Sequence, residues 1–357
     1  MADGRLRFGI IGCGGIAQSR HMPSLSRLPE VELAAFFDPT PARAEAARKS
    51  YGVRDAGVYA DYKALLQDSS IDVVHVCTTN ASHAEIAIAA LEAGKHVLCE
   101  KPMATTPEDA RRMVETARRT GRKLTVGYNN RFRPDSQLLY QICRQGDLGH
   151  IYYAKALALR RRGVPSWGAF LDREKQGGGP LVDVGSHALD LTLWLMDNWR
   201  PRLVLGSTYA HLGKRAGSAN DWAPWDPEKF TVEDSAFGFV IMENGATVVV
   251  ESSWALNVVD EGEGRALLCG TEAGADMVDD GVRLNGDEFG QRYVKHLDVA
   301  RDFTSQPPYG HELQCRLWVD AILRDEEPLV RPEEALVVTE ILDAIYRSAS
   351  SGEAIHL

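Results

Sequence analysis

The sequence predicts an α/β protein, in which a doubly wound parallel sheet is followed by a second domain with a largely antiparallel sheet. Short apolar runs alternate with helix-like stretches from residue 7 to about residue 127, which is the pattern of βαβ units. After Gly127 this rhythm stops, and turn residues join longer apolar runs. A chain of 357 residues also exceeds one ordinary core. We expect domains at 1–127 and 128–357, with the C-terminal helices able to pack back on the first.

The first part of the chain consists of alternating strands and helices. Its predicted strands are short apolar runs, and its predicted helices are rich in alanine or end at a glycine, as Pro41–Tyr51 does at Gly52. Strands joined by helices in this way run parallel. We expect strands at 7–12, 31–37, 71–77, 96–99 and 123–126, and helices at 16–28, 41–51, 82–93 and 107–120.

In the second part most predicted strands follow one another without a helix between them. Glu243-Asn-Gly245 lies between two apolar runs, and Asn-Gly is a strong hairpin signal because both residues tolerate positive φ. We therefore expect a mostly antiparallel sheet that carries a few helices. The strands are predicted at 151–159, 203–212, 235–242, 246–253 and 266–269, and the helices at 136–145, 312–324 and 332–348.

Composition and charge exclude several classes of protein. With 44% hydrophobic and 25% charged residues, and no apolar run near the roughly 20 residues that span a bilayer, we expect a soluble chain that binds no membrane. No signal-peptide pattern precedes the first strand, so we expect a cytoplasmic location. A net charge of −10 argues against nucleic acid as a partner. The six scattered cysteines contain no CxxC pair and indicate reduced thiols.

A glycine-rich turn between the first strand and the first helix predicts a dinucleotide site. Gly12-Cys-Gly14-Gly15-Ile16-Ala17 fits the pattern G-x-G-x-x-G/A. In that pattern the first glycine makes the tight turn, the second lets backbone approach a pyrophosphate, and the small last residue packs against the strand. Asp38 ends the next strand, about 20 residues on, where a carboxylate accepts hydrogen bonds from the adenosine ribose.

The same carboxylate favours NAD over NADP. Asp38 would repel a 2′-phosphate, and Pro39-Thr40 supplies no adjacent cation. Arg43 lies one turn into the next helix and could reach such a phosphate, although an exposed position on an alanine-rich helix is its commoner role. We predict NAD as the cofactor.

Five motifs, the first of which contains the glycine-rich turn, resemble one known family over nearly the whole chain. They are Gly9-Ile-Ile-Gly-Cys-Gly-Gly-Ile-Ala17, Thr78-Thr-Asn80 with His83, Gly94-Lys-His-Val-Leu-Cys-Glu-Lys-Pro102, Gly127-Tyr-Asn-Asn-Arg-Phe132, and Gly177-Gly-Gly-Pro-Leu-Val-Asp-Val-Gly-Ser-His187 followed by Asp190. The sequence is similar to the glucose-fructose oxidoreductase, inositol dehydrogenase and rhizopine catabolism protein (Gfo/Idh/MocA) family of NAD(P)-dependent oxidoreductases.

This resemblance implies an N-terminal Rossmann domain and a C-terminal α/β domain with a large open-faced sheet, through which a homodimer or homotetramer would form. It implies that Lys101 of the Glu-Lys-Pro motif, Asp183 and His187 are catalytic. The implied cofactor contacts are Gly12, Gly14, Gly15, Ile16, Asp38, Thr78, Asn80, His83, Glu100 and Lys101.

The acid–base chemistry can also be read from the residues themselves. Oxidation of a secondary alcohol requires removal of the hydroxyl proton, and a histidine has a suitable pKa. Pro180 after three glycines predicts a helix start, which would place Asp183, His187 and Asp190 on one helix face. A histidine flanked by aspartates is, however, often a surface cluster or a structural hydrogen bond. Lys101 follows a predicted strand at the carboxyl edge of the sheet, where its ammonium can donate to the reacting oxygen.

Signals for the substrate are weaker, and none points to a metal. Trp167 precedes the glycine run and could stack on a sugar ring or cover an interface. Arg160 could meet a substrate anion or lie at a solvated strand end. Tyr128, Asn129 and Arg131 lie near the site by resemblance. No HExxH motif, paired cysteines or G-x-S-x-G elbow occurs.

We therefore predict an NAD-dependent enzyme that oxidises a CH–OH group. Its substrate would be a small carbohydrate or polyol: a sugar, a glycoside or an inositol-like compound. Two alternatives remain at this point. One is an NAD-dependent glycosidase of the same family that oxidises its substrate transiently. The other is a non-catalytic NAD-binding regulatory protein.

Overall fold

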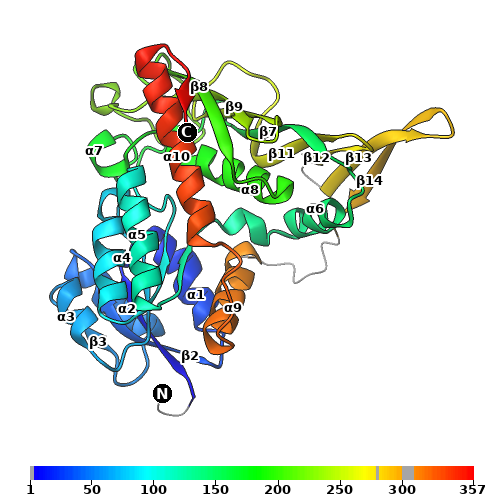
Figure 1. Ribbon diagram of the computed structural model, residues 1–357. Helices are drawn as coiled ribbons and strands as arrows, with labels where there is room; N and C mark the ends of the chain where they lie inside the picture. Colours follow the sequence, from blue (N-terminus) through cyan, green and yellow to red (C-terminus); the bar gives the residue numbers. More distant parts are fainter. Residues whose placement is uncertain (1–3, 279–280, 300–308) are drawn as a thin grey trace. The chain divides into compact units, whose positions relative to one another are not determined.

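The computed structural model describes residues 4–278, 281–299 and 309–357. The chain divides into two compact units, the first containing Met1–Asn129 and Gln306–Leu336 and the second Asn130–Ser305 and Val337–Leu357. Each unit has its own sheet (Figure 1). In the described ranges, no helix is long and apolar enough to cross a membrane, and no group of three or more His, Cys, Asp or Glu side chains could hold a metal ion.

The first unit contains a six-stranded parallel sheet in the order β3-β2-β1-β4-β5-β6. The doubly wound parallel sheet is thereby confirmed. The two-residue strand β3 and the short helix α3 were not predicted, because neither is long enough to show a hydrophobic period. The strands are β1 (Leu6–Ile11), β2 (Val31–Phe37), β3 (Gly57–Val58), β4 (Val73–Val76), β5 (His96–Cys99) and β6 (Leu124–Val126).

Helices cover both faces of this sheet. Side chains from α1, α2 and α9 share one buried core with β1 and β2, and α3 and α4 pack on the opposite face, with α5 against α4. The helix α9 lies far along the chain, yet it packs beside α1 (Figure 1). The bounds are α1 (Met22–Leu25), α2 (Pro41–Tyr51), α3 (Tyr62–Gln67), α4 (His83–Glu92), α5 (Pro107–Thr120) and α9 (Tyr309–Leu323), with a π-helical turn η1 (Ala17–His21) before α1 and a 3₁₀ turn η2 (Asn80–Ser82) before α4.

The second unit contains a nine-stranded sheet in the order β14-β13-β12-β11-β7-β10-β9-β8-β15. Among the described strands of this sheet only β7 and β10 pair in parallel, so the mostly antiparallel sheet is confirmed. The predicted Asn-Gly hairpin joins β9 to β10, with Gly245 at φ +87°. The strands are β7 (Ile151–Leu159), β8 (Pro201–Tyr209), β9 (Ser235–Met242), β10 (Thr247–Ser253), β11 (Gly262–Gly270), β12 (Gly274–Val278), β13 (Gly281–Glu288), β14 (Gln291–Asp298) and β15 (Ile355–His356).

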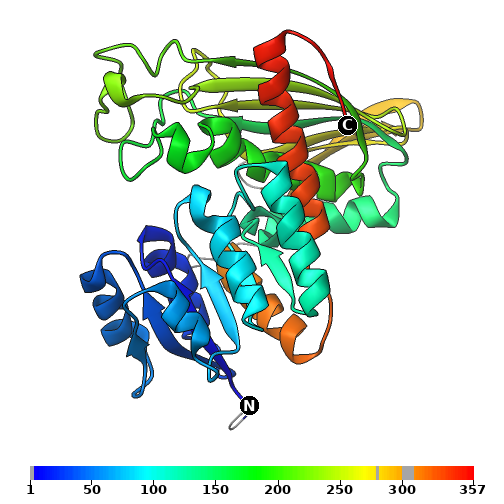
Figure 2. The ribbon, with the colours of Figure 1, turned by 60° about the vertical axis from the view of Figure 1, so that its left-hand side comes forward.

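One face of this sheet is buried by helices and the other is not. Gly206 of β8 and Gly238 of β9 have no side chain, and Ile345 of α10 fills the space above them, while α8 packs on β7 and β11 (Figure 2). On the opposite face Leu205 and Phe239 pair across β8 and β9 and are 48% and 44% exposed. The helical segments are η3 (Asn129–Phe132), α6 (Pro134–Gln145), α7 (Arg173–Gln176), a π-helical turn η4 (Leu181–Gly185), α8 (Ser186–Met196), η5 (Pro227–Lys229) and α10 (Pro332–Ser351), which begins in the first unit.

Candidate functional site

The glycine-rich turn lies at the carboxyl end of β1. Gly12 has φ +94°, and a Cβ there would lie 2.5 Å from the carbonyl oxygen of Cys77, so only glycine fits. A Cβ on Gly14 or Gly15 would meet nothing within 4 Å, and Ile16 after them is 37% exposed. The helix that begins here therefore has room beside its first N–H groups, which is the arrangement that binds phosphate.

Asp38 ends β2, and its carboxylate is bonded to this turn. Its Oδ2 accepts a hydrogen bond from the Cys13 backbone N–H (2.9 Å) and its Oδ1 accepts one from the Thr40 N–H (2.8 Å). A carboxylate has about four acceptor positions, so these two bonds leave capacity for ribose hydroxyls. Arg43, the alternative partner for a 2′-phosphate, is exposed on α2. The turn and Asp38 together fit a dinucleotide.

Three further predicted cofactor residues follow β4 at the same edge of the sheet. The Thr78 hydroxyl accepts a hydrogen bond from Ser82 (2.8 Å), and Asn80 is half-buried at the start of η2. His83 is buried, with Nδ1 2.8 Å from the carbonyl oxygen of Pro102 and Nε2 3.2 Å from that of Thr78. His83 therefore fastens the segment after β4 to the Glu-Lys-Pro segment.

Glu100 and Lys101 follow β5. Lys101 is half-buried, and its backbone N–H donates to Glu100 Oε2 (3.1 Å). Glu100 is buried, and its Oε1 lies 2.7 Å from Nε2 of His21. A Cβ at Gly127 would lie 2.8 Å from Glu100 Oε1, so the glycine after β6 makes room for this carboxylate. Lys101 thus stands at the carboxyl edge of the sheet beside an enclosed carboxylate.

Beneath Lys101 lies a buried cluster that the sequence analysis missed. Burial alone would lower the pKa of His21, but Cys77 and the Glu100 carboxylate raise that pKa to about 10. Burial would likewise raise the pKa of Glu100, but the His21 imidazolium lowers it to about 2. Nδ1 of His21 lies 3.1 Å from Nδ1 of His75, whose pKa burial and the His21 charge hold well below its usual range. The cluster is an ion pair with a neutral histidine behind it.

The predicted substrate residues after β6 differ in their burial. Tyr128 is buried and Asn129 is half-buried, and both belong to the first unit. Arg131, predicted to contact substrate, is fully buried. Its guanidinium forms two hydrogen bonds with the carboxylate of Asp190, at 2.9 and 2.6 Å, and lies over two tryptophan rings. The Arg131 guanidinium is thus paired inside the second unit, as a buried charge requires.

Asp183 and His187 lie on the helix that the triple glycine begins. Within 181–190, a stretch that is described throughout, these are the two residues that are not buried. The Asp183 carboxylate accepts a hydrogen bond from Nε1 of Trp254 (3.1 Å), and Nη1 of Arg160 lies 3.9 Å from it. Asp190, predicted on the same face, lies three residues after His187 on α8 and is instead buried in the ion pair with Arg131.

A second buried carboxylate holds the start of this helix. Oε1 of Glu233 accepts hydrogen bonds from the N–H groups of Gly179 (2.9 Å) and Leu181 (3.2 Å) and from the Tyr346 hydroxyl (2.7 Å). Burial raises the pKa of Glu233. A Cβ on Gly178 would lie 2.0 Å from the Tyr346 hydroxyl oxygen, and one on Gly179 would lie 2.2 Å from the Glu233 carbonyl oxygen. The glycines are therefore needed for this close packing.

The remaining predicted substrate residues lie close to Asp183. Arg160 forms two hydrogen bonds with Glu263 (2.6 and 2.7 Å), and its guanidinium lies 5.1 Å from the ring centre of Trp222. Trp167 is 52% exposed, and its ring packs edge-to-face on Trp222 at 4.9 Å. The second unit thus brings Asp183, His187, Arg160 and Trp167 into one neighbourhood, while Lys101 and the predicted cofactor residues belong to the first unit.

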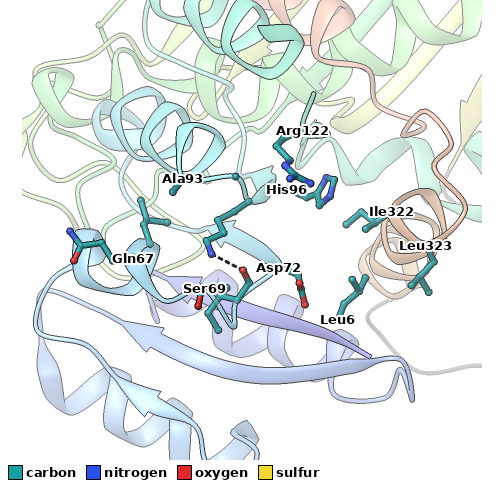
Figure 3. A pocket seen from close by; sticks show the side chains of 13 residues that line it. Leu6, Gln67, Ser69, Asp72, Ala93, His96, Arg122, Ile322 and Leu323 are labelled. Carbon is teal, nitrogen blue, oxygen red and sulfur yellow. Dashed lines mark hydrogen bonds between the residues drawn. The ribbon is translucent and has the colours of Figure 1, made fainter. Parts of the chain in front are cut away.

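A separate cavity of about 780 Å³ lies in the first unit (Figure 3). Leu6, Asp72, Lys95 and His96 line it at the amino ends of β1, β4 and β5. Doubly wound sheets bind ligands at the opposite, carboxyl edge. The Lys95 ammonium in its wall already donates to two backbone carbonyls, those of Asp68 and Ile71, at 2.7 and 2.8 Å. The candidate cofactor site of the first unit is therefore the carboxyl edge of its sheet.

Comparison with known proteins identifies the family of this chain. Residues 6–128 match the profile of an oxidoreductase family with an NAD-binding Rossmann fold, and residues 141–357 match that family's C-terminal alpha/beta domain. The chain is 34% identical to a D-glucoside 3-dehydrogenase of Escherichia coli strain K12, over all of this chain and 99% of that protein. It is 29% identical to inositol 2-dehydrogenase 2 of Saccharopolyspora erythraea, over 97% of this chain and 94% of the relative.

A solved structure resembles both units of the chain. Aldose-aldose oxidoreductase of Caulobacter crescentus, complexed with glycerol, has a TM-score of 0.80 and 26% identity, covering 99% of this chain and 100% of the other. The predictions of family, fold class and dehydrogenase-type enzyme are confirmed. The chain belongs to the Gfo/Idh/MocA family of oxidoreductases with an NAD-binding Rossmann domain.

Proposed function

We propose that this oxidoreductase transfers a hydride between NAD and a secondary hydroxyl of a sugar, glycoside or inositol-like polyol. The observation that carries the proposal is full-length similarity to a glucoside dehydrogenase, at 34% identity, in a chain that has Lys101, Asp183 and His187 at the positions the family motifs indicate. In this proposal 1–127 is the cofactor domain and 128–357 is the domain for substrate and oligomer contacts.

The cofactor residues support NAD rather than NADP. Gly12, Gly14, Gly15 and Ile16 would hold the pyrophosphate, with the Asp38 carboxylate at the adenosine ribose. A 2′-phosphate placed beside Asp38 would meet a negative charge that is already fixed by two backbone N–H groups. Thr78, Asn80, His83, Glu100 and Lys101 would border the rest of the cofactor, with His83 acting through the backbone that it holds.

The chain's own side chains would handle the proton. NAD, when bound, supplies the hydride acceptor. His187 removes the proton of the substrate hydroxyl, and the Lys101 ammonium donates a hydrogen bond to that oxygen as negative charge develops on it. Asp183, held by Trp254 and near Arg160, orients His187 and the substrate. Asn129, half-buried after β6, the strand that pairs with β5, would contact substrate at this edge of the sheet, whereas Tyr128 is buried beside it.

We also propose that the open face of the nine-stranded sheet joins subunits into a dimer or tetramer. Leu205 and Phe239, which pair across β8 and β9 on this face, are 48% and 44% exposed. Contiguous exposed apolar surface of this kind marks interaction sites. Sedimentation of the purified chain would measure the subunit number.

The test of the reaction is a polyol panel with two variants. Lys101→Ala and His187→Ala should each lower kcat by about 10²- to 10⁴-fold, the usual contribution of a positioned acid or base, while Lys49→Ala and His211→Ala, at exposed positions, should not. Near-normal turnover in either site variant would refute the assigned role.

The amounts of NADH and of released sugar distinguish a dehydrogenase from a glycosidase and from a regulatory protein. Sugars, glucosides and inositols are offered with NAD and with NADP, and both NADH formation and sugar release are measured. Stoichiometric NADH is the expected result. Release of a sugar without net NADH would identify a glycosidase, and tight NAD binding without any turnover would identify a regulatory protein.

A further inference from the structure

We propose that Trp167 and Trp222 form a subsite for a second ring, so that the preferred substrates are glycosides whose oxidised sugar carries another sugar or an aromatic ring. This inference rests on the proposed function and assigns the substrate class of the same site. The occupant is an uncharged ring that stacks on the two indoles.

The two tryptophans make an aromatic corner that is open to solvent. Trp167 is 52% exposed and Trp222 is 43% exposed. Their ring centres lie 4.9 Å apart with an interplanar angle of 70°. Two large rings at nearly a right angle present two walls, and apolar ring faces pack well against such walls.

Hydrogen bonds hold the two loops of this corner together without a ligand. Asn220 joins the loops that carry the two indoles: its Oδ1 accepts from the Val164 N–H (2.9 Å), and its Nδ2 donates to the carbonyls of Val164 (3.0 Å) and Ala223 (2.9 Å). The Asp221 N–H also donates to the Arg162 carbonyl (2.9 Å). Loops held in this way lose little conformational freedom when a ligand binds.

Two independent sets of contacts connect the corner to Asp183. On one side the Arg160 guanidinium lies 5.1 Å from the Trp222 ring centre and 3.9 Å from the Asp183 carboxylate. On the other side Trp167 packs on Phe170 at 6.0 Å, and Phe170 packs on Trp254 at 6.3 Å. Trp254 in turn donates to Asp183.

A sugar whose reacting hydroxyl is held at Asp183 would therefore direct a neighbouring ring toward the corner. Only one guanidinium, that of Arg160, lies between the Trp222 ring and the Asp183 carboxylate on the first of these two sides. A ring linked to that sugar would therefore lie beside the Arg160 guanidinium and the Trp222 ring.

The charges around the corner favour a neutral ligand. Glu263 holds the Arg160 guanidinium with two hydrogen bonds, and Asp183 lies against it from the other element. Arg160 also borders a cavity of about 650 Å³ whose wall carries three acidic residues, Asp260, Glu261 and Glu263, and one further cation, Arg265. An anionic group would be repelled there, whereas hydroxyl groups donate hydrogen bonds to carboxylates.

The experiment compares one-ring and two-ring substrates. Trp167→Ala and Trp222→Ala should each lower kcat/KM for cellobiose or phenyl β-glucoside by about tenfold and leave methyl β-glucoside within about twofold. Trp167→Phe should restore part of the loss. Tyr152→Ala is the matched control, because Tyr152 is equally exposed, at 51%, on β7. Calorimetric titration of the NADH-bound protein with cellobiose gives a second readout, in which both alanine variants should weaken binding.

Two other kinetic outcomes would overturn the subsite. An equal loss for both classes of substrate would mean that the tryptophans only support the loops. Unchanged kinetics together with a change in sedimentation would mean that they cover a subunit contact. A wild-type protein that oxidises no sugar would instead refute the proposed function, and the titration would still decide whether the corner binds a two-ring sugar.

Discussion

At the scale of single residues, the buried ion pair between His21 and Glu100 is the feature with the largest energetic consequence. Both side chains are almost removed from solvent, at 0% and 9% exposure. Removing one partner of such a pair leaves an uncompensated buried charge, which typically costs about 3–5 kcal/mol. Glu100 also accepts a hydrogen bond from the backbone N–H of Lys101. The ion pair therefore stabilises the segment that carries Lys101, the proposed hydrogen-bond donor to the substrate oxygen.

The pair predicts a distinct pH dependence of stability. His21 has its pKa raised to about 10 in the folded chain, so its contribution is fully present below the unfolded value near 6.5 and is lost as pH rises toward 10. His75 is neutral in both states above pH 6.5 and does not contribute there. Between pH 6.5 and 8.5 the wild type should lose about 2 kcal/mol of unfolding free energy that His21→Gln does not lose.

Urea unfolding at the two pH values measures this difference. His211→Gln serves as the control, because His211 is exposed on the second unit and should behave as wild type. A wild type and a His21→Gln variant that lose stability in parallel would show that His21 is not protonated in the fold.

At the scale of elements, each unit has one π-helical turn next to a proposed site. The turn η1 carries His21, and η4 carries Asp183. Such turns are rare and are often found at functional sites, because the extra residue redirects a side chain at a cost in helix stability. In the second unit Glu233 offsets part of that cost, since its carboxylate caps two orphan N–H groups at the helix start.

Removing this cap should disturb the chemistry more than cofactor binding. Glu233→Ala frees the start of η4, so we expect kcat to fall by about tenfold or more through misplacement of Asp183 and His187, while KM for NAD stays near wild type. Glu233→Gln, whose amide oxygen still accepts from both N–H groups, should restore most of the loss. Glu251→Ala, on the sheet and paired with Lys155, is the control. Equal effects on kcat and on the KM for NAD would contradict this role.

At the scale of the whole molecule, residues 306–336, which include α9, follow most of the second unit in the sequence but belong to the first unit. Trp318, Val319 and Cys315 of α9 belong to the same buried core as Phe8 of β1 and Met22 of α1. A fragment that ends at residue 129 therefore lacks one wall of its own core. Truncation of that kind exposes apolar surface, and every buried residue lost costs the fragment part of its small net stability.

A pair of fragments tests this division. Residues 1–129 alone should unfold without a cooperative transition and bind the dye ANS. The same fragment joined to 306–336 by a flexible linker should unfold cooperatively and bind NAD. The joined fragment with Trp318→Ala, which removes the largest α9 side chain from the core, should fall between them. A cooperative transition in the short fragment would show that α9 is not required.

Local sequence determined most of the first unit and the main strands of the second. The strands 31–37 and 96–99 and the helices 41–51 and 107–120 have the predicted bounds, because apolar period, proline at the helix start and glycine at the end act over a few residues. Strands β13 and β14 were missed, since their residues are mostly half-exposed or exposed and show no apolar period.

For the candidate site, too, local motifs predicted some features, and others became visible only in the tertiary structure. The turn at Gly12 and the carboxylate of Asp38 follow from motif and spacing, and the structure joins them by a hydrogen bond. The burial of Arg131, the pairing of His21 with Glu100 and the cap from Glu233 depend on residues 59, 79 and 52 to 54 positions apart. A single sequence determines local conformation, because neighbouring residues interact whatever the fold, whereas the partner of a buried charge is decided only when the tertiary structure removes both groups from water.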